Sequence, residues 1–290
     1  GPVVVGLLVV RHKVEYFEEV GTGLGPTLEF YSLVLSEFAR KDLKIWHDAD
    51  ADGTGLYVDH PSGLYPAPLG PQDISTDGGQ KRTQIFRVVG QFVAKAMLTS
   101  RIIDLSLNKI FVEIVFGEEV PLTIAMLKLI DVSSAKSLET IQSIVAATAE
   151  TDKVKRKTPL NENVNIDDLG LELTIPGYDI QLRPGGRAVA VTADNVDKYI
   201  HEVIDAIVGN GAQLQAKAFR EGFSKVFPIS DLQAFSADEL VLLFGGRLEH
   251  RQSLNEAIKA DHGFNGESRA IRDLVEIQYD GPSRRNYLQS

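Results

Sequence analysis

Cysteine is missing from all 290 residues of this chain. Its absence excludes disulfides, zinc–thiolate sites and thiol nucleophiles formed by these residues. A reaction that proceeds through a cysteine therefore cannot be completed by this chain alone. The absence also weakly favours a reducing compartment, and we expect a cytoplasmic and/or nuclear location.

Long hydrophobic runs are also lacking, because the longest apolar stretch covers only residues 3–10. That stretch is too short to span a bilayer, and it lacks the cleavage-site features of a signal peptide. No membrane association is expected. Gly1 and Pro2 are interpreted as the remnant of a cleaved expression tag and are left out of the fold prediction.

Positive charge is scarce, since 30 Lys and Arg against 40 Asp and Glu give a formal net charge of -10. Nucleic-acid binders normally carry a basic stripe, because phosphate contacts supply most of their affinity. The one basic cluster, within residues 153–157, is interpreted as a solvated helix end. We therefore expect no nucleic-acid partner. An acidic surface is compatible with a basic protein partner but does not identify one.

Recognisable catalytic motifs are missing too. The glycines at 21, 23 and 25 are followed by Pro26, where a dinucleotide-binding fingerprint requires glycine. The six histidines form no HExxH or i,i+4 pair, and no GxSxG elbow occurs. Each histidine is interpreted as a surface or capping residue. The sequence thus predicts no catalytic residue, no metal site and no cofactor.

One acidic loop leaves an alternative open. The ligand spacing of a calcium-binding loop is matched by Asp48, Asp50, Asp52, Gly53 and Asp59. Two features count against calcium. Gly55 occupies the position where an apolar residue is usual, and prolines at 61 and 66 exclude the helix that should follow. We interpret residues 48–59 as a solvated loop, with a calcium-regulated binding module as the alternative.

Apolar residues recur at three- and four-residue spacing along most of the chain, which predicts helices. The expected helical ranges are 26–38, 80–98, 108–117, 121–129, 134–150, 196–207 and 214–226, followed by short helices within 229–281. Alternating residues predict strands at 171–175, 180–182 and 189–191, joined as antiparallel hairpins by Pro-Gly turns. Because the strands are grouped rather than alternating with helices, we predict a predominantly helical α+β fold.

The region 229–281 is small and crowded with apolar side chains. A unit of this size cannot bury all of them well, so a partly exposed groove for a partner is one interpretation. The alternative is a non-catalytic helical scaffold or interaction module, in which these side chains only complete the core.

Five stretches resemble, in the same order, the N-terminal lobe of HECT-type ubiquitin ligases. They are GTGLGPTLEFYSLVLSEF at 21–38, FRVVGQFVAKAML at 86–98, GLELTIPGYDIQLRPGGRAVAVTADNVDKYI at 170–200, AFREGFSKVFP at 218–228 and ELVLLFGG at 239–246. Residues 258–277 are most similar to the ubiquitin-fusion-degradation and thyroid-receptor-interacting branch of the family. Residues 3–10 match the family poorly.

The resemblance implies a division of the chain. Residues 3–227 would form the large subdomain of the lobe, and residues 228–281 a small helical subdomain that binds a ubiquitin-conjugating enzyme. Residues 282–290 would form a helix leading to a hinge. The C-terminal lobe, which holds the catalytic cysteine in this family, would be absent.

The same resemblance implies a function. A HECT ligase takes ubiquitin from a conjugating enzyme onto its own cysteine and passes it to a substrate lysine, which marks the substrate for degradation. The implied partners are the conjugating enzyme, ubiquitin, and protein substrates bound through regions outside this fragment. The fragment alone is expected to be inactive. The implied docking groove comprises Leu232, Phe235, Leu240, Leu243, Phe264 and Leu274, with Asp238 and Asp273 at its polar rim.

Overall fold

The computed structural model of the chain describes residues 24–48, 54–98, 103, 105–153 and 166–245, with the backbone alone for 24–29 and 147–153. Contacts divide the chain into two compact units, 1–246 and 247–290, and every described residue belongs to the first. The described part is predominantly helical, as the sequence predicts. None of its helices is long and apolar enough to cross a membrane.

Every expected helix that falls within the described residues is present, and the part of the expected short helices within 246–281 lies outside them. The α-helices of the described part are α1 (Leu24–Phe38), α2 (Asp77–Leu98), α3 (Lys109–Phe116), α4 (Ile124–Lys128), α5 (Val132–Lys153), α6 (Val196–Val208), α7 (Asn210–Ser224) and α8 (Ala237–Leu243). Short 3₁₀ turns are η1 (Lys41–Leu43), η2 (Ile166–Leu169), η3 (Gly186–Ala188) and η4 (Ile229–Leu232).

Side-chain caps explain where several of these helices begin. Asn108 accepts a hydrogen bond from the N–H of Ile110 and starts α3, and Gly117 ends α3 at a φ of 81°. Helix α2 begins three residues earlier than expected, because the Thr76 hydroxyl accepts the N–H of Gly79 at 3.0 Å. The Gly- and Asp-rich run before residue 80 masked this cap in the sequence.

The predicted strand region, 171–191, contains isolated antiparallel bridges in place of continuous strands. Glu172 pairs with Ala190, and Thr174 pairs with Gln181 across the Pro-Gly turn. Leu173, Ile175 and Ile180 are buried beneath these bridges, so the expected alternation of inward and outward side chains is present. The expected hairpins are therefore represented only by single bridges.

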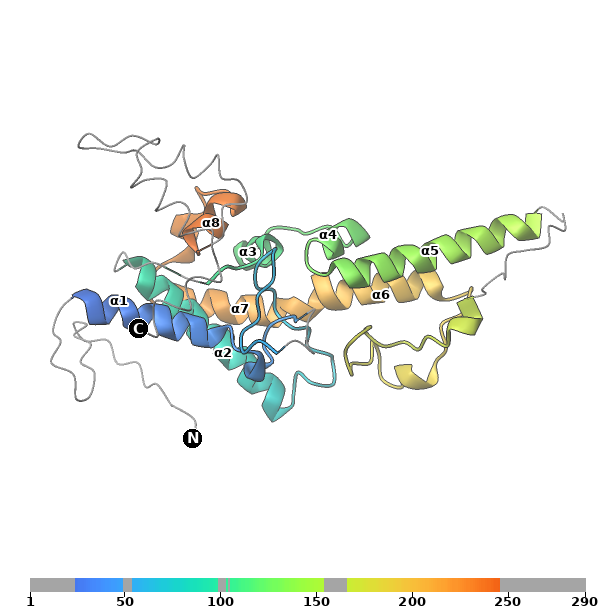
Figure 1. Cartoon of the computed structure of the whole chain (residues 1–290), viewed down its shortest axis with the longest axis horizontal. Coiled ribbons are helices and arrows are strands. Elements are labelled where there is room, and N and C mark those ends of the chain that lie inside the picture. The colour runs from blue at the N-terminus through green and yellow to red at the C-terminus, as the bar shows by residue number, and fades with distance from the viewer. Residues whose placement is uncertain (1–23, 49–53, 99–102, 104, 154–165, 246–290) are drawn as a thin grey trace. The chain divides into compact units, whose positions relative to one another are not determined.

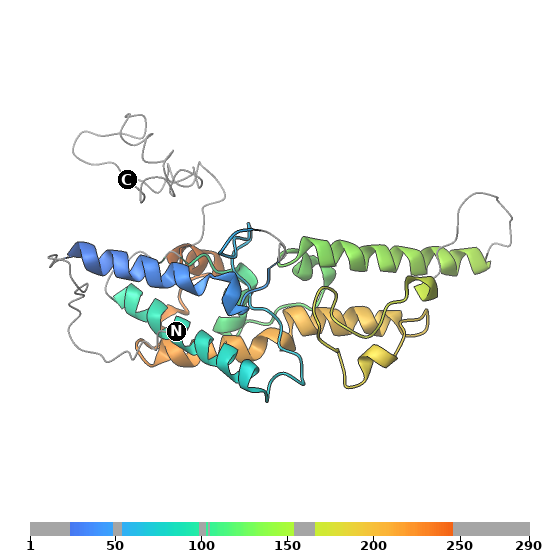
Figure 2. The ribbon, with the colours of Figure 1, turned by 60° about the horizontal axis from the view of Figure 1, so that its bottom comes forward.

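Helices α2 and α7 form the most extensive helix–helix contact of the described part, and the two helices cross in Figure 2. The contact depends on two glycines. A Cβ on Gly90 would lie 2.1 Å from the carbonyl oxygen of Phe219, and a Cβ on Gly222 would lie 1.9 Å from that of Arg87. Arg87 and Glu221 add an ion pair of 2.6 Å across the same helices. The two backbones approach each other as only glycine permits.

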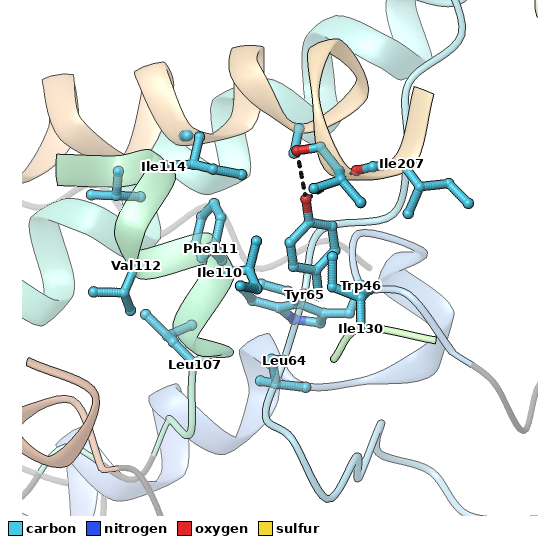
Figure 3. Close-up of a cluster of buried hydrophobic side chains, with 14 of the residues drawn as sticks. Trp46, Leu64, Tyr65, Leu107, Ile110, Phe111, Val112, Ile114, Ile130 and Ile207 are labelled. Carbon is cyan, nitrogen blue, oxygen red and sulfur yellow. Dashed lines mark hydrogen bonds between the residues drawn. The ribbon is translucent and has the colours of Figure 1, made fainter. Parts of the chain in front are cut away.

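An aromatic cluster fills the space between α2, α3 and α7 (Figure 3). Phe111 of α3 lies within 6.4 Å, between ring centroids, of Trp46, Tyr65, Phe86 and Phe219. Tyr65 is buried, and its hydroxyl donates to the carbonyl of Ile207 at 2.9 Å, at the end of α6 (Figure 3). Burial raises the pKa of Tyr65 above its ordinary range. The cluster ties segments that are distant in sequence into one core.

Candidate functional site

The short helix α8 presents the exposed apolar surface that the sequence singled out. Ser236 caps its start, since the Ser236 hydroxyl accepts the N–H of Glu239 while the Glu239 carboxylate accepts the N–H of Ser236, a capping box. At the other end, Gly245 adopts a φ of 83°. A Cβ there would lie 2.0 Å from the carbonyl oxygen of Ile103. These local features fix where α8 begins and ends, and how it meets the core (Figure 1).

One face of α8 is part of the core. Ala237, Leu240 and Phe244 are buried, and the ring of Phe244 lies edge-on to Phe223 of α7 at 6.3 Å. Leu232 in η4 is buried as well. Leu232 and Leu240, both predicted to line a docking groove, are therefore part of the core on the buried side of α8.

The other face of α8 and the residue before its cap are exposed. Phe235, Leu242 and Leu243 keep 47%, 45% and 42% of their surface accessible, although large apolar residues usually become buried. Leu242 was not among the predicted groove residues. We call these three residues the α8 surface.

Carboxylates border the α8 surface, and both already have partners within the chain. Asp238 lies 2.9 Å from the ammonium of Lys109 at the start of α3. Glu239 accepts from the backbone and the hydroxyl of Ser236, and these hydrogen bonds lower its pKa. Asp238 was predicted as a polar rim for a basic partner. In the structure Asp238 is exposed and pairs with Lys109, and its role at a rim stays a prediction.

Phe264, Asp273 and Leu274 lie outside the described residues. The structure brings Leu232, Phe235, Asp238, Leu240 and Leu243 together around α8, and the assignment of the full groove stays a prediction.

A second polar cluster lies in the interior and was missed by the sequence patterns. His47 is buried, with Nδ1 hydrogen-bonded to the Tyr178 hydroxyl and Nε2 3.2 Å from Oδ2 of Asp131. The interpretation of every histidine as a surface or capping residue is therefore wrong for His47. Its partners stand 131 and 84 positions away in the chain, which no local pattern can report.

Asp131 is the centre of this cluster. It precedes α5 and accepts the N–H of Ser134 at 2.9 Å and the Ser134 hydroxyl at 2.5 Å. Burial would raise the pKa of Asp131, but the contact with His47 and the hydrogen bonds from Ser134 outweigh burial and hold that pKa well below its usual range. Burial raises the pKa of Tyr178. Because His47 and Asp131 are buried, this cluster joins segments of the fold and offers no open site for chemistry.

Of the residues that match the calcium spacing, Asp50, Asp52 and Gly53 lie outside the described part. Asp48 is described and lies 3.0 Å from the ammonium of Lys41, so an internal cation already neutralises it. Within the described ranges, no three His, Cys, Asp or Glu side chains are grouped so that they could hold a metal ion.

Comparison with known protein families gives one match over most of the chain. The family model described as HECT-domain (ubiquitin-transferase) matches residues 32–289. The match includes α8, the polar cluster around Asp131 and nearly all of the described residues.

Individual relatives agree with this match. The chain is 37% identical over 282 residues to the probable ubiquitin fusion degradation protein of Schizosaccharomyces pombe, covering 96% of this chain and 16% of that protein. It is 37% identical over 301 residues to ubiquitin fusion degradation protein 4 of Saccharomyces cerevisiae, covering 96% and 19%. It is 34% identical over 306 residues to E3 ubiquitin-protein ligase TRIP12 of Danio rerio, covering 96% and 15%. The chain thus spans less than a fifth of each of these relatives.

Proposed function

Because this chain belongs to the HECT family of ubiquitin transferases, we propose that it is the lobe on which a ubiquitin-charged conjugating enzyme docks. The observation that carries the proposal is the α8 surface, where Phe235, Leu242 and Leu243 remain exposed on a helix whose other face is firmly packed. Exposed apolar groups with polar neighbours are typical of protein interfaces. The docked enzyme would present its ubiquitin to a cysteine outside residues 1–290, since these contain none.

The wider activity belongs to the same proposal. Ubiquitin would pass from that cysteine to a lysine of a protein substrate, leading to protein degradation, and the substrate would bind through regions outside this chain. The names of the yeast relatives, which refer to ubiquitin fusion degradation, support this proposal. The proposal also includes the division of the chain into a large subdomain, 3–227, and a docking subdomain, 228–281. It includes a cytoplasmic and/or nuclear location as well.

Replacing Phe235 with alanine is expected to weaken binding of the conjugating enzyme by about 1–3 kcal/mol, the usual effect of removing an aromatic anchor. The fold should be little affected, because the side chain is nearly half exposed. Isothermal calorimetry against a panel of conjugating enzymes measures the affinity, and circular dichroism checks the fold.

The matched control is Leu33→Ala on α1. Leu33 is similarly exposed, at 50%, but does not belong to the α8 surface, so its removal should leave the affinity unchanged. If Phe235→Ala binds as tightly as the unmodified chain, the α8 surface is not the docking site. A chain that binds no conjugating enzyme at high micromolar concentration would instead behave as a non-catalytic scaffold.

A further inference from the structure

A groove of about 550 Å³ opens where the end of α3 meets the junction of α6 and α7. Its apolar lining is formed by Ile114, Val120, Leu122 and Val208. Every lining residue lies in the described part, and none belongs to the α8 surface. A space of this size can accept a few side chains of a bound segment.

The lining of the groove carries more negative than positive charge. Glu118, Glu119 and Asp205 contribute three carboxylates, and Arg220 contributes the single cation of the lining. Arg220 is fixed against the end of α3, since its guanidinium donates to the carbonyl of Val115 at 2.6 Å and to that of Ile114 at 2.9 Å. Asp205 accepts from the side-chain amide of Asn210 at 2.8 Å. The groove therefore favours a cation on its occupant.

The negative charge continues from the groove towards α8. Glu113 lies one turn after Lys109 on α3 and interacts electrostatically with Lys109, Glu118 and Asp238. Burial raises the pKa of Glu113; the charge of Lys109 opposes this increase, and the charges of Glu118 and Asp238 add to it. Lys109 in turn contacts Asp238 of α8. Glu113 and the Lys109–Asp238 pair thus lie along α3 between Glu118 and the edge of the α8 surface, and carboxylates outnumber the one ammonium along this line.

We propose that this groove receives a basic segment of the same conjugating enzyme that docks on α8. Lysine or arginine side chains of that segment would lie against Glu118, Glu119 and Asp205, and an apolar side chain would contact the floor. The inference rests on the proposed function. A second copy of this chain fits poorly, because its net charge of -10 would oppose an acidic groove. Nucleic acid fits poorly for the same reason.

The test is the double charge reversal Glu118→Lys/Glu119→Lys, measured by interferometry against the conjugating enzyme that binds the unmodified chain most tightly. We expect a roughly five- to tenfold loss of affinity at low salt, mostly through slower association, because charge complementarity steers encounter. The loss should shrink at about 0.5 M salt as screening shortens the range of the charges.

The matched control is Asp194→Lys/Asp197→Lys. These two exposed carboxylates lie at the start of α6 outside the groove, and their reversal changes the net charge equally. The milder Glu118→Gln/Glu119→Gln variant should also bind the conjugating enzyme more weakly than the unmodified chain. It serves as a second test in case the charge reversal disturbs the fold. If the groove variant and the control variant bind the conjugating enzyme with equal affinity, the groove proposal is wrong. The Phe235→Ala result, and with it the docking proposal on α8, would remain intact. An unmodified chain that binds no conjugating enzyme would overturn both.

Discussion

Replacing Gly222 with alanine is expected to destabilise the chain by about 3 kcal/mol, at the upper end of the cost of overpacking a tight contact. The added methyl group would lie 1.9 Å from the carbonyl oxygen of Arg87, so α2 and α7 would have to separate. Gly90→Ala should cost a similar amount, since its methyl group would meet the carbonyl of Phe219 at 2.1 Å. Urea unfolding followed by circular dichroism measures both changes.

Gly78→Ala is the matched control, because Gly78 also lies in α2 but a Cβ there meets nothing closer than 3.9 Å. Alanine suits a helix better than glycine, so this variant should be neutral or stabilised by up to about 1 kcal/mol. The double variant Gly90→Ala/Gly222→Ala should cost less than the sum of the two, since helices forced apart once accept the second methyl group more easily. If Gly222→Ala behaves like Gly78→Ala, the two helices are not in backbone contact.

Replacing Asp131 with alanine is expected to cost about 3 kcal/mol at neutral pH. The change removes the cap of α5 and leaves the buried hydrogen-bond donors of Ser134 without their acceptor. It also removes the carboxylate that lies 3.2 Å from Nε2 of His47. Asp131→Asn keeps a capping side chain but loses the charge, so it should fall between alanine and the unmodified chain. Asp194→Asn, at an exposed position, should change stability by less than about 0.5 kcal/mol.

The effect of Asp131 should depend on pH in a defined direction. Its folded-state pKa lies below the ordinary value of 3.8, so the carboxylate contributes stability that is fully present above that pH and is lost as the pH falls further. The stability gap between Asp131→Asn and the unmodified chain should therefore narrow as the pH is lowered from 4 towards the folded-state pKa. Thermal unfolding between pH 7 and pH 2.5 measures the gap, and a gap that widens on acidification would contradict the assigned cluster.

Helix positions could be predicted from the sequence because a helix that buries one face repeats apolar residues every three or four positions. Tyr31 and Leu35 of α1, for example, are buried as their four-residue spacing indicates. The close contact at Gly90 and Gly222 was not predictable in the same way. Glycine has low helix propensity, so the local sequence pattern indicates only that each of these residues weakens its helix. Only the neighbouring backbone shows why they are needed.

The position of helix α8 could be predicted from the sequence, but not which of its faces is exposed. Residues 240–243 are four apolar residues in succession, and such a run does not reveal which face of the helix points inward. The structure buries Leu240 and exposes Leu242 and Leu243. The pairing of Asp238 with Lys109, 129 positions away, likewise depends on how α3 and α8 pack.

The central claim is that the α8 surface docks a ubiquitin-conjugating enzyme. Titration of the isotope-labelled chain with such enzymes, followed by nuclear magnetic resonance, tests it most directly, because it reports binding and location together. We predict saturable shifts at Phe235, Leu242 and Leu243, with Leu33 unmoved. Binding that shifts other residues and leaves these three unchanged would contradict the account.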